Sequence, residues 1–190
     1  ADTIIEQIKR QGVPNYFGEQ RFGHDGGNLV KALRWFSGEF RPKQRHHMSL
    51  YLSAARSWIF NHILSERVQA GTWFERREGD VCVLDDIHSW FVDDGSEALS
   101  RRLVSMDIHP SGAMWGEGEL PSTSVMRDIE LAAAAKFPEF CAGLEKNRLK
   151  QERRALRIKV SDLMCQSIDD STLALSFTLP AGAYATVLLD

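Results

Sequence analysis

The hydrophobic period of this sequence changes along the chain, and that change restricts the fold more than any other feature. Between residues 42 and 70, apolar side chains recur every three or four positions, at Met48, Leu52, Ala55, Ile59 and Ile63. This spacing predicts one long amphipathic helix, with Pro42 in its first turn and its end near Ala70. After residue 150 the period falls to two, as in half-buried strands, over residues 156–160 and 173–179. The sequence therefore predicts a largely helical middle followed by an antiparallel sheet.

Capping and stop signals predict the shorter elements. A first helix begins at Asp2 or Thr3 and stops at Gly12, and Pro14 agrees with the stop because the residue before a proline avoids helical geometry. Similar patterns predict helices over 28–36, 96–104 and 123–137, one or two short strands within 80–92, an irregular loop over 108–116, and a turn at 169–171. A short N-terminal piece thus precedes the helical middle.

Charge is distributed unevenly. Lys and Arg number 23 and Asp and Glu 26, a net charge of −3, which excludes a tail that binds nucleic acid through bulk charge. Five basic residues nevertheless lie between Lys31 and Arg45, and seven between Lys146 and Lys159. These two stretches either form a positive face for a polyanion or are simply solvated faces of the fold.

The cysteines and the apolar content indicate a cytoplasmic protein. The three cysteines are widely spaced and form no Cys-x-x-Cys pair, which argues against a disulfide framework and against a zinc site. Adjacent His46 and His47 point to different helix faces, so they predict no metal site either. No apolar run approaches the roughly 20 residues of a membrane span, and we expect no signal peptide. We therefore expect no membrane partner.

The segment from Asn15 to Gly23 has the most unusual composition. It interleaves three aromatic residues with two amides, Asn15 and Gln20, with Arg21 and with glycines. Such residues suit an unstacked nucleotide, because an aromatic ring stacks on the base, an amide pairs with its edge and a guanidinium binds phosphate. The alternative is a buried turn with aromatic packing and a surface Arg–Glu pair.

Four segments together resemble one protein family. Residues 15–23, Asn-Tyr-Phe-Gly-Glu-Gln-Arg-Phe-Gly, resemble the signature of the TruD family of tRNA pseudouridine synthases. Residues 177–186 resemble that family's C-terminal motif. Two further segments resemble family segments in the same order, 109–116 and 149–154. Together they extend over most of the chain.

The resemblance implies an α+β fold. It implies a pseudouridine-synthase catalytic domain with a mixed, mainly antiparallel sheet, interrupted by an inserted, largely helical α/β domain. The expected division is 1–40 for the first part of the catalytic domain, 41–151 for the insertion and 152–190 for the returning part. Members of the family are isomerases that convert uridine, at position 13 of tRNA, to pseudouridine without a metal or cofactor. The expected partner is therefore tRNA, and no protein partner is implied.

The same resemblance assigns roles to residues of this chain. Asn15 would contact the nucleotide that is flipped out of its stack, Phe17 would shape the pocket, and Phe177 would stack on the base. Gln20 is the second amide of the segment and joins the expected RNA-binding residues. We assign Arg21, on electrostatic grounds, to a phosphate or to pairing with the catalytic carboxylate.

One departure from the family matters for activity. The family's nucleophilic aspartate lies in a Lys-Asp motif upstream of the Asn-Tyr-Phe-Gly segment, and no lysine of this sequence is followed by aspartate. We therefore expect no catalytic residue within the chain, which would be a fragment inactive alone with an unpaired edge in its catalytic sheet. Two alternatives remain, a non-catalytic RNA-binding module and a protein-interaction fragment.

Overall fold

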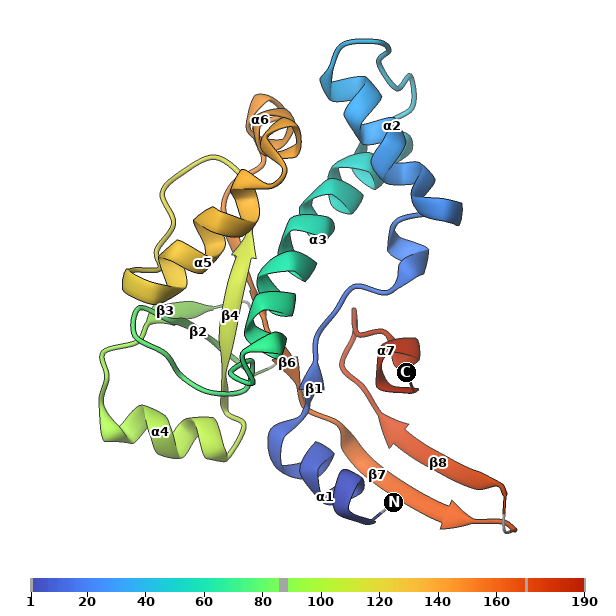
Figure 1. Cartoon of the computed structure of the whole chain (residues 1–190), viewed down its shortest axis with the longest axis vertical. Helices are drawn as coiled ribbons and strands as arrows, with labels where there is room; N and C mark the ends of the chain where they lie inside the picture. Colours follow the sequence, from blue (N-terminus) through green and yellow to red (C-terminus); the bar gives the residue numbers. More distant parts are fainter. Residues whose placement is uncertain (1, 86–88, 170, 190) are drawn as a thin grey trace.

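The longest helix, α3 (Arg45–Gln69), runs through the centre of the molecule, and the other elements lie around it (Figure 1). The structure, a computed structural model, describes residues 2–85, 89–169 and 171–189. Small and branched residues of α3 are fully buried, among them Ala54, Ala55, Ile59 and Ile63. The predicted long amphipathic helix is therefore confirmed. Its start is corrected, because Gln44 has an extended backbone (φ −99°, ψ 134°), so that Arg45 is the first helical residue and Pro42 lies before the helix.

Three helices pack against α3 and complete its core. They are α2 (Gly27–Phe36), α5 (Ser124–Ala135) and α6 (Pro138–Lys146). Gly143 of α6 lies so close to the Phe36 ring that an added Cβ would be 2.2 Å from it, so glycine permits the close approach of α2 and α6. The helices predicted over 28–36 and 123–137 are confirmed to within two residues. The proposed domain limits, 1–40, 41–151 and 152–190, remain a prediction.

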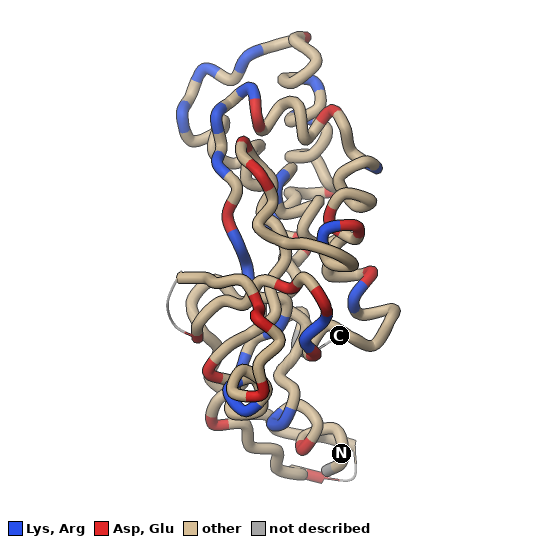
Figure 2. The backbone as a smooth tube through the Cα atoms, turned by 90° about the vertical axis from the view of Figure 1, so that its left-hand side faces the viewer, with Lys and Arg blue, Asp and Glu red and all other residues tan. Residues whose placement is uncertain are grey.

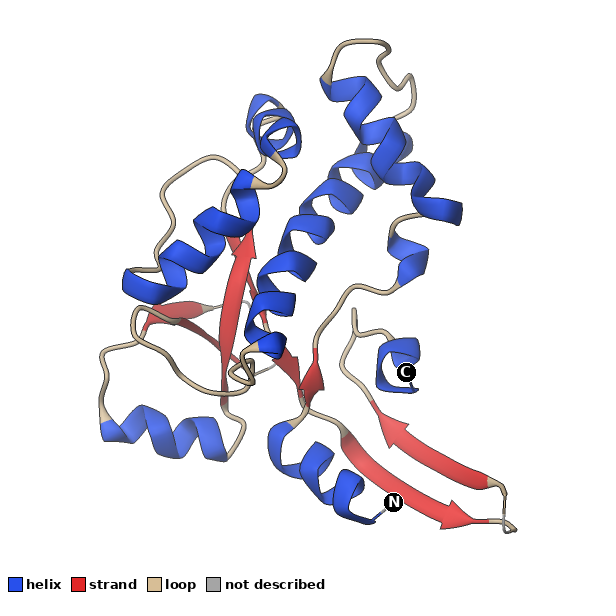
Figure 3. Ribbon diagram, in the orientation of Figure 1, coloured by secondary structure: helices blue, strands red, loops and turns tan. Residues whose placement is uncertain are grey.

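A four-stranded sheet lies against α3 (Figure 3). Its order is β3 (Trp90–Val92), β2 (Val81–Leu84), β4 (Ile108–Met114) and β5 (Glu152–Ala155), and every ladder is antiparallel. One or two strands were expected within 80–92, and the structure has two there; α4 (Glu97–Val104) is the helix expected over 96–104.

Strand β4 corrects the loop predicted over 108–116. Pro110 and Gly112 lower strand propensity, but β2 and β5 pair with β4 on both sides, and this tertiary pairing outweighs the local preference. Gly112 also has a packing role, because a Cβ there would lie 3.1–3.2 Å from Leu156, Ile63 and Phe60. Residues 108–114 therefore form one of the two inner strands of the sheet and not a loop.

A smaller unit holds both ends of the chain (Figure 1). It contains α1 (Asp2–Gln11), the ladder of β1 (Val13–Pro14) with β6 (Arg157–Ile158), the hairpin of β7 (Ser161–Ser167) with β8 (Leu173–Thr178), and α7 (Ala185–Leu189). In the described residues the β7–β8 sheet has two strands only, and Met164, Leu173 and Leu175 are exposed. Both outer edges of this hairpin are therefore unpaired there.

The turn predicted at 169–171 lies partly outside the described residues, since residue 170 is not among them. Within the rest of this turn, Ser171 donates from its N–H and from Oγ to Asp169 Oδ1, at 2.8 and 2.9 Å.

No helix in the described part of the chain combines the length and the apolar character that crossing a bilayer requires.

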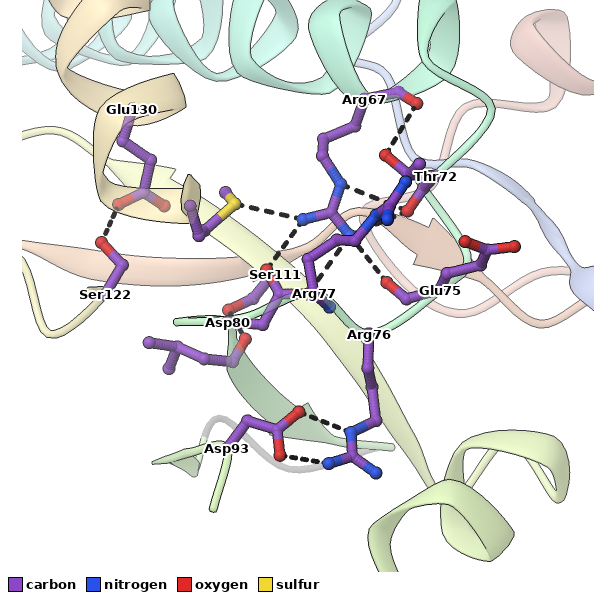
Figure 4. A network of polar contacts seen from close by, with 12 residues as sticks. Arg67, Thr72, Glu75, Arg76, Arg77, Asp80, Asp93, Ser111, Ser122 and Glu130 are labelled. Atoms are coloured by element: carbon purple, nitrogen blue, oxygen red, sulfur yellow. Dashed lines mark hydrogen bonds and ion pairs between the residues drawn. The ribbon is translucent and has the colours of Figure 1, made fainter. Parts of the chain in front are cut away.

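A buried ion pair joins the end of α3 to the sheet (Figure 4). Arg67 and Asp80 are both fully buried, and Arg67 donates to both Asp80 carboxylate oxygens, at 2.7 and 3.2 Å. The remaining guanidinium donors bind the backbone oxygens of Thr72 and Glu75. Asp80 also accepts from the N–H of Arg77 at 2.6 Å. Every hydrogen-bonding group of the pair is thus engaged, as burial of charge requires.

Candidate functional site

The Asn15 side chain is fixed between two segments of the chain. It is 5% exposed and follows β1. Its Nδ2 donates to the backbone oxygen of Ala155 at 2.9 Å, and its Oδ1 accepts from Arg154 Nη2 at 2.7 Å. The backbone N–H of Asn15 donates to Leu156 O at 2.9 Å. The amide expected to contact a nucleotide is therefore bound to the β5–β6 segment in this structure.

Phe17 lies under a guanidinium and against the central helix. Its ring is buried, with Arg154 Cζ 3.9 Å from the ring centroid and the Phe60 ring edge-on at 5.7 Å between centroids. The Asn61 carboxamide on α3 accepts from the N–H of Phe17 and donates to its carbonyl, both at 2.9 Å. Because both its ring and its backbone are held, Phe17 has a fixed position.

Arg21 connects the first and last resembling segments. Its Nε donates to Tyr184 Oη at 2.9 Å, and its Nη1 donates to Ser53 Oγ at 2.8 Å. Tyr184 also meets the Phe17 ring edge-on, with 6.1 Å between centroids. Gly18 permits this approach, since a Cβ there would lie 2.9 Å from the Tyr184 ring. Segments 15–23 and 177–186, far apart in sequence, thus form one structural unit.

Arg21 and Arg154 concentrate positive charge around Phe17. Their Cζ atoms lie 5.2 and 3.9 Å from its ring centroid. In the described residues no carboxylate lies within 4.0 Å of either guanidinium. Burial, together with the nearby charge of Arg21 and against the opposing effect of Tyr184, lowers the pKa of Arg154 to about 10. Arg154 therefore stays charged at neutral pH, and both groups favour an anion nearby.

A pocket of about 730 Å³ opens beside this cluster. It brings together two of the sequence-predicted site residues, Phe17 and the exposed Gln20. The rest of its wall comes from both ends of the chain and from α3, and consists of Pro14, Tyr16, Gly18, Glu19, Asn61, Thr186 and Val187. Two aromatic rings and two amides in one pocket are suited to a planar heterocycle.

Phe177 lies outside the wall of this pocket. It is half-buried on β8 and packs on the apolar cluster of Val13, Ile158, Val160 and Leu163. Val13 of that cluster is two residues before Asn15, so the two regions adjoin. The structure therefore brings Asn15, Phe17, Gln20 and Arg21 together and places Phe177 in the neighbouring cluster.

Three residues of the site were not assigned from the sequence. Arg154 lies in the basic, family-like segment 149–154, and Tyr184 lies in the family-like segment 177–186. Their positions in these segments gave a weak indication of a role in the site. Nothing in the sequence indicated a role for Asn61, because a polar residue in a long helix is most often solvent-exposed. Only tertiary contacts bring Arg154, Tyr184 and Asn61 next to segment 15–23.

Apart from Arg154, the residues of the other two resembling segments make structural contacts. Ser111 is fully buried in β4 and donates from Oγ to Val81 O at 2.5 Å. Arg153 donates to Ser111 O at 2.7 Å and forms an ion pair of 2.7 Å with buried Glu130. These contacts join β4, β5 and α5. In the described residues no three His, Cys, Asp or Glu side chains gather as metal ligands.

Comparison with known proteins agrees with the resemblance. Residues 27–190 match the family model described as "tRNA pseudouridine synthase D (TruD)". The chain belongs to the TruD family. Curated relatives named tRNA pseudouridine synthase D include those of Hydrogenovibrio crunogenus (50% identical over 188 residues) and Nitrosococcus oceani (47% over 189 residues). These alignments cover 99% and 97% of this chain, but only 54% and 52% of the two relatives.

The fold is also that of a solved TruD structure. A crystal structure titled as the putative tRNA pseudouridine synthase D of Methanosarcina mazei has a TM-score of 0.67 and 18% identity, and the match covers 99% of this chain and 62% of that one. The α+β class with antiparallel sheets is thereby confirmed. The family model begins at residue 27, so segment 15–23 lies outside it but inside the curated alignments. The chain spans about half the length of those relatives.

Proposed function

We propose that this chain forms part of a tRNA pseudouridine synthase that isomerises uridine, at position 13 of tRNA, to pseudouridine. Two kinds of observation support the proposal: membership of the TruD family, and the contact of the two motif segments around Phe17. The strongest support for the proposal is the Arg21–Tyr184 hydrogen bond of 2.9 Å, because it holds segments 15–23 and 177–186 together beside one aromatic pocket. We place the reaction in the cytoplasm, with tRNA as partner.

The reaction breaks the bond from ribose to the base nitrogen, turns the base, and forms a bond from ribose to carbon 5 of the base. The hydrogen on carbon 5 leaves as a proton, and the base nitrogen gains one, so atoms balance. We propose that the aspartate this chemistry needs comes from a Lys-Asp segment that is not among these residues, since no lysine here precedes an aspartate. Arg21 and Arg154 would favour its ionised form.

The proposed contacts of the flipped nucleotide involve four further residues. Phe17 would form the wall of the pocket and Gln20 its rim, as their place in the pocket wall supports. Asn15 would bind the nucleotide by giving up its bond from Arg154. Phe177 would stack on the base from the side of β8, where stacking contributes about 1–3 kcal/mol per base.

Tritium release from tRNA labelled at carbon 5 of uridine tests the proposal, because isomerisation expels that hydrogen. In the protein as its gene encodes it, Phe177→Ala is expected to reduce turnover about tenfold or more with little loss of tRNA affinity. Phe91→Ala is the matched control, since Phe91 is also half-buried but lies on β3. Unchanged turnover in Phe177→Ala would reject the stacking role.

A non-catalytic RNA-binding module is the alternative function. It is favoured by the engagement of the Asn15 carboxamide with protein atoms at both ends. This alternative predicts that the natural protein binds tRNA but releases no tritium. Absence of tRNA binding at low salt would contradict both functions, because each requires contacts to phosphate.

A further inference from the structure

A second basic surface lies at the end of the molecule formed by α2, the start of α3 and the end of α6. Its centre is a cavity of about 450 Å³ whose wall includes Arg41 and Lys146. Arg41 follows α2 and Lys146 is the last residue of α6, so the fold joins the two basic stretches seen in the sequence. Figure 2 shows Lys and Arg segments gathered at this end. We call Arg41, Lys43, Arg45, Lys146 and Arg148 the tip surface.

The charges of the tip surface are not neutralised by the protein. All five side chains are exposed, and none lies within 4.0 Å of a carboxylate in the described residues. Two other cations of the same basic stretches are neutralised, because Arg34 forms an ion pair with Glu39 at 2.7 Å and Lys150 one with Glu117 at 2.5 Å. Unpaired cations gathered in a chain of net charge −3 produce a local positive field that a polyanion can use.

Close packing holds the two halves of the surface in a fixed relation. Phe36 of α2 contacts Gly143 of α6, where an added Cβ would be 2.2 Å from the ring. It also meets Phe140 of α6 edge-on, with 6.4 Å between centroids. The end of α6, with Lys146, is therefore held against α2, which ends five residues before Arg41.

The tip surface is separate from the pocket beside Phe17. Arg45 begins α3, and Asn61, which holds Phe17, lies sixteen residues later, which is about 24 Å along a helix axis. A ligand that reaches both places must be long and carry charge along its length. Nucleic acid meets both conditions, whereas a small anion would fill one place only.

We propose that the tip surface binds backbone phosphates of RNA several nucleotides away from the base held beside Phe17. This rests on the proposed function for the identity of the RNA as tRNA. Arg41, Lys43 and Lys146 contact phosphate oxygens without reading bases, so they add affinity and not sequence preference. Their contribution weakens with salt, because each contact releases a counterion.

The test compares two triple variants of the natural protein that lose the same charge. One carries Arg41→Ala, Lys43→Ala and Lys146→Ala. The control carries Arg10→Ala, Arg77→Ala and Arg101→Ala, three exposed arginines without a carboxylate partner in the described residues. Binding of tRNA is measured from 50 to 300 mM KCl, and thermal unfolding verifies that both variants fold.

The tip variant is expected to bind tRNA about tenfold or more weakly at 100 mM KCl, and to lower the slope of log Kd against log salt by about two to three. The control variant is expected to stay within about twofold. Equal loss in the two variants, or an unchanged slope in the tip variant, would overturn the proposal. So would a tip variant that keeps tRNA binding but loses binding to phosphatidylserine vesicles, since the surface would then serve a membrane.

Tritium release separates this proposal from the proposed function. With saturating tRNA, the tip variant is expected to keep its kcat and to raise KM, because the tip surface does not touch the reacting base. If the natural protein releases no tritium but the tip variant still loses tRNA affinity, the tip surface is supported and the isomerase function fails. A fall in kcat with unchanged affinity would overturn the tip proposal.

Discussion

The guanidinium of Arg154 lies 3.9 Å from the centroid of the Phe17 ring, and its Nη2 donates to Asn15 Oδ1 at 2.7 Å. Arg154 is the last residue but one of β5 and lies 139 positions after Asn15 in the sequence. One side chain therefore fixes both the aromatic ring and the amide on which the proposed nucleotide site depends. It is also a cation without a carboxylate partner in the described residues, so it is placed to favour an anion there.

Arg154→Met is expected to lower the free energy of unfolding by about 1–3 kcal/mol, because Asn15 Oδ1 and Gly182 O lose a donor and Phe17 loses its cation contact. Urea unfolding of the 190-residue chain measures the change. The control Arg101→Met, at an exposed position of α4, is expected to change it by less than about 0.5 kcal/mol. Equal effects would show that the Arg154 contacts contribute nothing specific.

Gly18→Ala tests the contact between segments 15–23 and 177–186. Gly18 has φ −72°, which alanine adopts without strain, so the expected loss of about 1–2 kcal/mol arises from the Cβ that would lie 2.9 Å from Tyr184. Gly27→Ala in α2 is the matched control, because nothing lies within 4 Å of a Cβ there. That variant should be neutral or slightly more stable. A neutral result at Gly18 would mean that Tyr184 is not held beside it.

Arg67→Met should be the most destabilising of these changes. It leaves the Asp80 carboxylate buried without its partner, and breaking such a pair costs about 3–5 kcal/mol (Figure 4). Adding Asp80→Asn removes the unpaired charge and is expected to restore part of the loss. Equilibrium unfolding of Arg67→Met, Asp80→Asn and the double variant gives the coupling between the two residues. A loss below about 1 kcal/mol in Arg67→Met would contradict the account of this pair.

Unfolding should depend on pH through His109. Burial lowers the pKa of His109 and outweighs Asp85, whose Oδ1 lies 3.0 Å from Nε2 and raises the pKa; Arg157 opposes protonation by donating to Nδ1 at 3.1 Å. The unfolded chain therefore takes up the proton first, so the free energy of unfolding falls as pH drops below about 6.5, with a slope of at most about 1.4 kcal/mol per pH unit.

His109→Gln should remove this part of the pH dependence. Exposed His47 of α3 provides the control, and His47→Gln is expected to leave the profile of unfolding against pH unchanged. The measurement is urea unfolding between pH 5 and 8. A profile that keeps its slope in His109→Gln would assign the effect to other groups.

The sequence allowed the helices and the family to be predicted, since these depend on local period and on contiguous segments. The long helix is one example, because its apolar residues repeat at helical spacing. Strand β4 could not be predicted, because Pro110 and Gly112 disfavour a strand locally and only pairing on both sides produces one. The start of α3 at Arg45 likewise depends on the extended backbone of Gln44.

The site could be predicted in part. Segment 15–23 was identified by its composition, and the structure places Phe17 and Gln20 in one pocket wall. The partners of that segment could not be identified, because Arg154, Tyr184 and Asn61 meet it only through tertiary packing. The position of Phe177 could not be predicted for the same reason, because the alternating pattern of its strand does not determine which apolar cluster the ring packs on.

The proposed function assigns the residues around Arg21 to the isomerisation of a uridine in tRNA. The most direct measurement is the rate of tritium release by the natural protein from tRNA labelled at carbon 5 of uridine 13, with and without Arg21→Gln. We expect release of one tritium per tRNA molecule by the natural protein, and a rate lowered about 100-fold or more by Arg21→Gln. No release by the natural protein, or an equal rate in the variant, would contradict the account.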